Sequence, residues 1–226
     1  MTLCWFAEAT APSPVLSTAG LDDLAALTAA VPGVTEAHLF TPAATNDPWL
    51  NDGAPPGLAL QLYFDGIASL EAALSPGGAL MPLPDRLGPD FTQQAMLARG
   101  FAVPDPVPGL TAACTYLVAY HGTAADVPLW LSHYIDHHAP IMTRFPAVRL
   151  VEVCSRIDWC GVLPWRRVSA MQRNKVVFDD PRALTLALNS PVRHEMRADF
   201  ARFPPFSGAV THFPMRTRIH YGVQNS

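Results

Sequence analysis

Side chains that could do chemistry are concentrated in residues 130–140, which read Trp-Leu-Ser-His-Tyr-Ile-Asp-His-His-Ala-Pro. Three of the eight histidines of the chain lie in this stretch, together with Trp130 and Tyr134. An imidazole exchanges protons near neutral pH, and a phenol can donate a hydrogen bond to a developing oxyanion. The stretch therefore predicts acid–base chemistry beside an aromatic wall, with His138, Tyr134 and His133 as the catalytic candidates.

Helical spacing indicates where His138 points. One face of a helix would carry Val127, Leu131, Tyr134, Ile135, His138 and Met142, which recur at three- and four-residue steps. Pro140 has no amide proton and would free the carbonyl of Asp136, so the helix should be disturbed directly beside His138. We therefore expect His138 in an apolar pocket next to a polar edge. A core histidine bonded to a backbone carbonyl is the alternative.

The motif also resembles that of a known family. Its residues are Trp130-x-x-His133-Tyr134-x-x-x-His138-Ala139-Pro140, followed by Phe145-Pro146. This spacing resembles the F-x-x-Y-W-x-x-x-H-A-P pattern of EthD-type proteins in the dimeric α+β barrel superfamily. His138 falls on the motif histidine, whereas Trp130 replaces the Phe and His133-Tyr134 replaces the Tyr-Trp pair. The resemblance covers roughly the C-terminal half and implies ferredoxin-like units whose sheets pair into a barrel.

The predicted function is a cofactor-independent lyase, isomerase or cyclase, as the family resemblance implies. It would use a histidine for acid–base chemistry on a small, largely apolar carbonyl or aromatic compound. The alternative is a non-catalytic binding protein for a hydrophobic metabolite or haem. The candidates for substrate binding are Trp130, His137, Trp159, Trp165, Phe178 and Arg173. Trp159 and Trp165 lie in the connection 157–168, which would form either an aromatic lid over the pocket or a small satellite core.

Metal binding and an organic cofactor are not expected. Histidines at positions i and i+4 can share an ion, as His133 and His137 could, but the chain has no HExxH motif. It also lacks a phosphate-binding glycine loop, a dinucleotide fingerprint and a G-x-S-x-G elbow. Kinases, NAD enzymes and serine hydrolases are therefore unsupported.

Basic side chains could meet an anionic or carbonyl group of a substrate. The candidates for this role are Arg156, Arg173, Arg193, Arg197 and Arg216, joined by His194 and His212. An i, i+4 pair such as Arg193 and Arg197 is typical of a solvated helix face. On the last strand, alternation predicts that His212 and Arg216 look across the barrel interface rather than into the His138 site.

Composition indicates a globular protein. The chain has 226 residues, of which 50% are apolar and 15% charged, so it can bury a sizeable core. The formal net charge of −4 and the absence of a basic tract argue against nucleic-acid binding.

No apolar run approaches the roughly 20 residues that cross a bilayer, so no membrane partner is expected and a cytoplasmic protein is the default. The four cysteines form no CxxC pair and are expected to be mostly buried thiols. The sequence leaves open whether two chains form a homodimer.

The two halves of the chain resemble each other. Four anchor pairs share an offset of 114, namely Val31 with Phe145, Phe64 with Phe178, Leu70 with Leu184 and Leu74 with Leu188. A repeat of this length predicts two ferredoxin-like βαββαβ units, 1–108 and 109–226, whose antiparallel sheets pair into an α+β barrel within one chain. Two separate tethered domains are the alternative. The motif residues Trp130, His133, Tyr134, His138 and Pro140 map onto Leu16, Ala19, Gly20, Leu24 and Ala26, which predicts a site in the second unit only.

The expected elements follow this repeat. In the first unit we expect strands at 2–8, 34–40, 58–64 and 101–103, and helices at 21–30, 69–74 and 91–99. In the second we expect strands at 116–121, 148–157, 174–178 and 209–219, and helices at 127–144, 182–188 and 192–203.

Overall fold

Eight antiparallel strands close into a barrel. The computed structural model describes residues 2–12, 16–45 and 47–222. Nine strands form one sheet in the order β1-β3-β2-β9-β5-β8-β6-β4-β7, and the additional pairing of β4 with β1 closes the ring. Strand β7 stands outside the ring because it pairs only with β4, in parallel. The closed ring leaves no long sheet edge unpaired.

The chain passes twice through the same order of elements. The strands are Thr2–Ala9 (β1), Val34–Pro42 (β2), Ala59–Phe64 (β3), Phe91–Phe101 (β4), Ala112–Ala124 (β5), Val148–Arg156 (β6), Arg166–Arg167 (β7), Gln172–Phe178 (β8) and Phe206–Tyr221 (β9). The helices are Thr18–Ala29 (α1), Ile67–Ala73 (α2), Leu83–Leu87 (α3), Val127–His133 (α4), Tyr134–His138 (η1), Ala139–Met142 (α5), Pro181–Leu188 (α6) and Pro191–Phe200 (α7).

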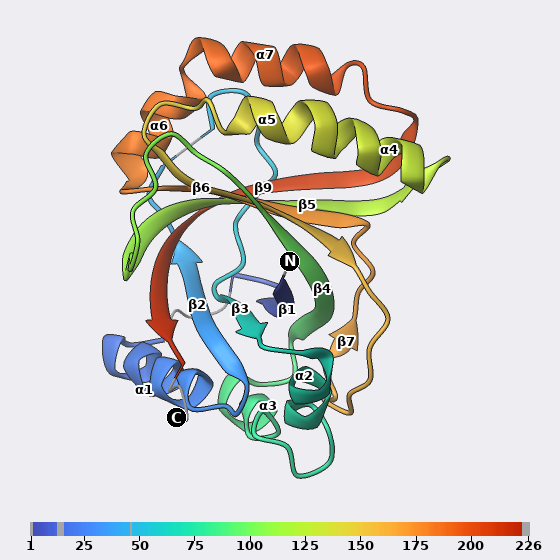
Figure 1. The fold of residues 1–226 in the computed structure, drawn as a ribbon. Helices are drawn as coiled ribbons and strands as arrows, with labels where there is room; N and C mark the ends of the chain where they lie inside the picture. Colours follow the sequence, from blue (N-terminus) through green and yellow to red (C-terminus); the bar gives the residue numbers. More distant parts are fainter. Residues whose placement is uncertain (1, 13–15, 46, 223–226) are drawn as a thin grey trace.

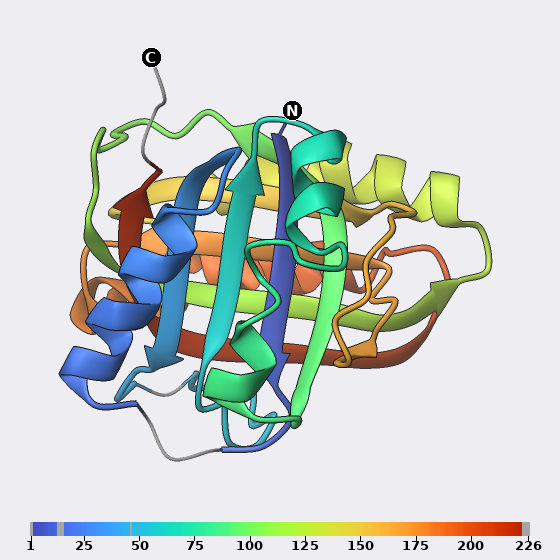
Figure 2. The ribbon, with the colours of Figure 1, turned by 90° about the horizontal axis from the view of Figure 1, so that it is seen from below.

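Each pass builds a ferredoxin-like sheet, in the order β4-β1-β3-β2 for the first and β9-β5-β8-β6 for the second. Pairing of β2 with β9 and of β4 with β6 joins the sheets. Helices α1 to α3 cover one sheet and α4 to α7 the other (Figures 1 and 2). Strands β2 and β6 even share a bulge at the same place, between Val34 and Glu36 and between Val148 and Leu150. The predicted tandem repeat in one barrel is confirmed, and the alternative of separate tethered domains is wrong.

The interior of the barrel holds a buried polar cluster beside small apolar clusters, in contrast to the two large apolar cores under the helices. Lys175, the only lysine of the chain, is 2% exposed there. Its ammonium group donates to His38 Nδ1 and to Gln61 Oε1, each at 3.2 Å, and to the hydroxyl of Tyr63. Glu152 Oε1 lies 3.6 Å from Lys175 Nζ and accepts hydrogen bonds from Gln61 and Tyr63. Side chains from both repeats therefore satisfy one buried ion pair.

The segment 91–99 is a strand, so the predicted helix is wrong. Strand β4 runs from Phe91 to Phe101 and pairs with both β1 and β6. Its first six residues are all buried because one face packs on helices and the other faces the barrel interior. Tertiary pairing overrides the helix-forming tendency of Gln, Ala, Met and Leu here.

The connection 157–168 belongs to the core of the first repeat. The indole of Trp165 stacks on Trp5 and Phe91, with ring centroids 6.1 and 4.8 Å apart. Trp159 packs against the same core, and the guanidinium carbon of Arg167 lies 3.9 Å from its ring centroid. The predicted lid is therefore wrong, and instead of a separate satellite core the connection adds to the main core of the first repeat. None of the helices in the described ranges is long and apolar enough to span a membrane.

Candidate active site

The helix that carries the motif widens at His138. Between α4 and α5, residues Tyr134–His138 form a π-helical turn, in which the amide of Ala139 donates to the carbonyl of Tyr134. Pro140 follows directly and cannot donate an amide proton, so the wider turn fits the expected disturbance. Single π-helical turns are frequent at functional sites. Here the turn buries both Tyr134 and His138 on the side of the sheet.

His138 is held by a carboxylate from another helix. Its Nδ1 lies 2.8 Å from Asp199 Oδ2, and the other oxygen of Asp199 lies 3.2 Å from His133 Nε2. Asp199 is 7% exposed and projects from α7. A carboxylate that accepts from Nδ1–H fixes the tautomer and leaves Nε2 with the lone pair. Within the described residues, Nε2 of His138 has no hydrogen-bond partner.

The imidazole of His138 is neutral at physiological pH. Burial lowers its pKa to about 4, against the hydrogen bond and the charge of Asp199, which raise it. The nearby side chains of His133 and Arg193 lower the pKa further. A neutral ring with an open nitrogen can act as a general base.

Tyr134 lies one turn before His138, with ring centroids 4.8 Å apart. Its hydroxyl accepts a hydrogen bond from the amide of Asn174 on β8. Burial raises the pKa of Tyr134, so the phenol stays protonated. Behind it, Trp130 stacks on the ring at a centroid distance of 5.1 Å and fixes its position. Tyr134 is therefore a rigid, neutral hydrogen-bonding group.

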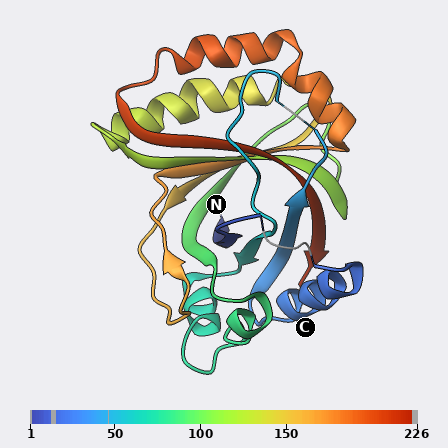
Figure 3. The ribbon, with the colours of Figure 1, turned by 180° about the vertical axis from the view of Figure 1, so that it is seen from behind.

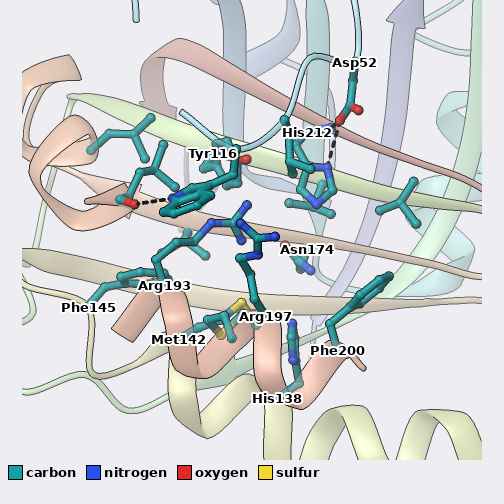
Figure 4. Close-up of a pocket in the computed structure, with 18 of the residues that line it drawn as sticks. Asp52, Tyr116, His138, Met142, Phe145, Asn174, Arg193, Arg197, Phe200 and His212 are labelled. Atoms are coloured by element: carbon teal, nitrogen blue, oxygen red, sulfur yellow. Dashed lines mark hydrogen bonds and ion pairs between the residues drawn. The ribbon is translucent and has the colours of Figure 1, made fainter. Parts of the chain in front are cut away.

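A cavity of about 390 Å³ lies between the second sheet and its helices (Figure 4). Ligand pockets commonly fall in this size range. The wall is mostly apolar, and its polar members are Asp52, Tyr116, Tyr120, Tyr134, His138, Asn174, Arg193, Arg197 and His212. Figure 4 shows His138 at one side of the cavity and the two arginines reaching into it from α7. A largely apolar ligand would thus meet a base and several fixed polar groups.

The first repeat contributes part of this wall. We call the connection between β2 and β3, residues 43–45 and 47–58, the strap, which rises from the first sheet to the helices of the second (Figure 3). Asp47 lies 3.0 Å from Arg193, and the indole of Trp49 donates to the carbonyl of Leu188 at 3.3 Å. Trp49, Leu50 and Asp52 of the strap line the cavity.

The structure brings some predicted residues together and separates others. His138, Tyr134 and Phe178 line the cavity. Two others lie behind the cavity wall, where His133 contacts Asp199 and Trp130 contacts Tyr134. His137 is exposed beside His133. Three predicted substrate-binding residues lie elsewhere, since Trp159 and Trp165 pack on the first repeat and Arg173 forms an ion pair with Glu8 inside the barrel.

Several residues of the site escaped the sequence analysis. Asp199 is 61 positions from His138, but a local signal exists, because α7 buries Arg193, Met196 and Asp199 at three-residue steps. A charged residue on a buried stripe indicates a polar partner. The prediction for His212 is wrong, because this side chain lines the cavity and bonds to Asp52 of the strap at 2.8 Å. No local signal marks the strap as part of the site.

The equivalent position in the first repeat shows no comparable chemistry. Leu24, which corresponds to His138, is 2% exposed in the apolar core of the first repeat. Across the described ranges, no group of three or more His, Cys, Asp or Glu side chains could hold a metal ion.

Two buried histidines should make the protein sensitive to acid. Burial lowers the pKa of His38 to about 4, as it does for His138, whereas an unfolded histidine titrates near 6.5. Between these values the unfolded chain binds more protons, so the free energy of unfolding falls as pH falls from 6.5 to 4. Each histidine accounts for about 3 kcal/mol at most. Urea titrations at several pH values measure this slope.

The control is His137→Asn, which removes an exposed histidine and should leave the slope unchanged. His38→Asn should flatten it. An unfolding free energy that stays constant over this range would contradict neutral, buried imidazoles.

Comparisons with known proteins show the fold. No protein-family model and no curated protein matches the sequence. A solved structure described as an anthrone oxidase-like protein is 10% identical, with a TM-score of 0.65 over 99% of this chain and 94% of its own. Putative monooxygenases from Lactobacillus acidophilus NCFM and from Fusobacterium nucleatum subsp. nucleatum ATCC 25586 are each 7% identical. Their TM-scores are 0.56 and 0.59, over 95% and 98% of this chain and 93% and 95% of their own.

These likenesses show that the chain shares the α+β barrel fold of these structures. The predicted function needs a correction. A cofactor-independent lyase, isomerase or cyclase conflicts with neighbours that are described as oxidase-like or as monooxygenases over nearly their full lengths. That prediction is therefore wrong.

Proposed function

We propose that the protein is an oxygen-dependent oxidase or monooxygenase that acts on a largely apolar aromatic ketone with an acidic C–H bond. The observation that carries the proposal is the buried, neutral His138, whose Nδ1 is bonded to Asp199 while the residue lines an apolar cavity. The description of one structural neighbour as anthrone oxidase-like supports this substrate type, because an anthrone is a tricyclic ketone with an acidic methylene group. The resemblance of residues 130–140 to the EthD-type motif, in which His138 corresponds to the motif histidine, also supports a role for this side chain.

The chemistry begins with proton transfer. His138 Nε2 removes a proton from the methylene carbon, and Asp199 stabilises the imidazolium that forms. The resulting carbanion is delocalised onto the ketone oxygen, where the protonated hydroxyl of Tyr134 can donate a hydrogen bond. The apolar wall around the cavity keeps bulk water from the anion.

Molecular oxygen is the oxidant. The carbanion gives two electrons to O₂ as a C–O bond forms, and the imidazolium returns its proton to the peroxide, which gives a hydroperoxide. Loss of the remaining C–H proton and cleavage of the O–O bond yield a second ketone and water. The balanced reaction is R₂CH₂ + O₂ → R₂C=O + H₂O. Because the imidazolium returns its proton to the peroxide, His138 is again a neutral base when the second C–H proton is removed.

An oxygen electrode tests the proposal with anthrone as the probe. The wild-type protein should consume one O₂ for each anthraquinone formed, by the stoichiometry above. His138→Ala should lower the rate about 10²- to 10⁴-fold, as loss of a general base typically does. His137→Ala, which removes a neighbouring exposed histidine, is the control. No oxygen uptake above buffer, or a His138→Ala rate within threefold of wild type, would contradict the proposal.

A non-catalytic binding protein for haem or a hydrophobic metabolite is the second candidate. One observation favours haem, because histidines that bind a metal usually donate Nδ1–H to a carboxylate, as His138 can to Asp199. Addition of haemin should then give a Soret band that His138→Ala shifts or removes. A spectrum identical in both proteins would exclude His138 as an iron ligand.

A further inference from the structure

The basic side chains around the cavity differ in their partners. Arg193 forms an ion pair with Asp47 at 3.0 Å, and the two histidines are hydrogen-bonded to carboxylates, His138 to Asp199 and His212 to Asp52, at 2.8 Å each. Arg197 also lines the cavity, but among the described residues it takes part in no ion pair. It is therefore the one lining cation of the described chain without a matched negative charge.

Arg197 is nevertheless held in place. Its guanidinium carbon lies 4.5 Å from the ring centroid of Trp49, so the cation rests on the indole of the strap. Arg193 and Arg197 are four residues apart on α7 and share one face of that helix. Figure 4 shows both guanidinium groups extending from α7 into the cavity. Within the described residues, only one of these two guanidinium groups, that of Arg193, is paired with a carboxylate.

In the described part of the chain, Arg193 keeps one buried donor without a partner next to the cavity. Arg193 is 8% exposed, and its Nε is buried with no hydrogen-bond partner within the described residues. A buried donor without a partner costs about 1–3 kcal/mol. The other carboxylate at the cavity wall, Asp52, accepts two N–H bonds from His212 at 2.8 Å each and so has its own donors.

We propose that the substrate carries an anionic oxygen group, such as a ring carboxylate, that binds Arg197 beside Arg193. The substrate class is then an acidic aromatic ketone, bound with its charged end at α7 and its rings in the apolar cavity. This inference rests on the proposed function for placing the reacting carbon at His138. The binding preference itself does not depend on any reaction.

Unreactive probes test the binding of an anionic group separately from the proposed oxidation. Anthraquinone carboxylate and the corresponding carboxamide have the same rings and no acidic methylene group, so neither can be oxidised as proposed. Isothermal titration should show that wild-type protein binds the carboxylate about tenfold more tightly than the carboxamide, since charge-assisted hydrogen bonds are about twice as strong as neutral ones. High salt should reduce this ratio, because Arg197 is exposed to solvent.

The variants assign the preference to one residue. Arg197→Gln should bring the carboxylate-to-carboxamide ratio close to one, and Arg197→Lys should keep part of it. Arg202→Gln is the matched control, because it removes one exposed arginine just beyond α7 that does not line the cavity. It should leave the ratio at the wild-type value.

Three outcomes would overturn the inference: equal affinities of the two probes for wild-type protein, a ratio unchanged in Arg197→Gln, or no binding of either probe. The wild-type ratio and Arg197→Lys decide the question even if Arg197→Gln does not fold. A normal preference with no oxygen uptake on anthrone would retain the anion site and reject the proposed oxidation. Oxygen uptake on anthrone without a preference for the carboxylate probe would support the proposed oxidation and reject the anion site.

Discussion

Asp199→Asn is expected to lower kcat/KM for the oxidation about 10²- to 10⁴-fold. Asp199 accepts from His138 Nδ1 at 2.8 Å and from His133 Nε2 at 3.2 Å. An amide has one acceptor oxygen and one donor nitrogen, so it can present N–H to Nδ1 and leave the proton on Nε2. The base would then be blocked, and the imidazolium would lose its countercharge. Steady-state kinetics with anthrone and an oxygen electrode measure the effect.

Asp136→Asn is the matched control for this substitution. Asp136 lies in the same π-helical turn and is exposed to solvent. Its replacement should leave kcat/KM within about twofold, as surface substitutions usually do. If Asp199→Asn keeps a native circular dichroism spectrum and more than a third of wild-type activity, the His138–Asp199 pair is not the catalytic base.

Lys175→Met should destabilise the protein by about 3–5 kcal/mol, because removal of one partner leaves a buried charge uncompensated. Glu152 is 8% exposed, and Lys175 Nζ is the cation 3.6 Å from its Oε1. The substitution also removes the donor to His38 Nδ1 and Gln61 Oε1. Urea unfolding at neutral pH gives the change in free energy.

Two further variants separate charge from packing. Glu152→Gln combined with Lys175→Met removes both charges and should recover part of the loss. Arg216→Met removes an exposed positive charge from β9 and should change the stability by less than about 0.5 kcal/mol. A Lys175→Met protein as stable as Arg216→Met would show that the buried ion pair contributes little.

The barrel could be predicted because the duplication left a regular trace in the sequence. The offset of 114 between Phe64 and Phe178 also relates Val34–Pro42 to Val148–Arg156, the bounds of β2 and β6. Such anchors survive because equivalent positions face equivalent cores. Once two ferredoxin-like units are recognised, the closed sheet follows, since each exposed sheet face needs a partner.

Strand β4 could not be predicted from local pattern. It is buried on both faces, so the alternation of polar and apolar residues that marks a strand is absent from Phe91 to Met96. The buried position of His138 was predictable from helical spacing. Spacing on α7 could mark Asp199 as buried, but its pairing with His138 could not be predicted, because it depends on the packing of α7 on the π-helical turn. The strap is likewise a tertiary feature, since Asp47 meets Arg193 across 146 positions.

Anaerobic hydrogen exchange tests most directly whether His138 is the base. In D₂O without oxygen, the wild-type protein should accelerate deuterium incorporation into the methylene carbon of anthrone, followed by NMR. The rate should stay high down to about pH 5, because the pKa of His138 lies at about 4. His138→Ala should lose at least about 10²-fold of the acceleration. Exchange no faster than in buffer, or equal exchange with His138→Ala, would contradict proton abstraction by His138.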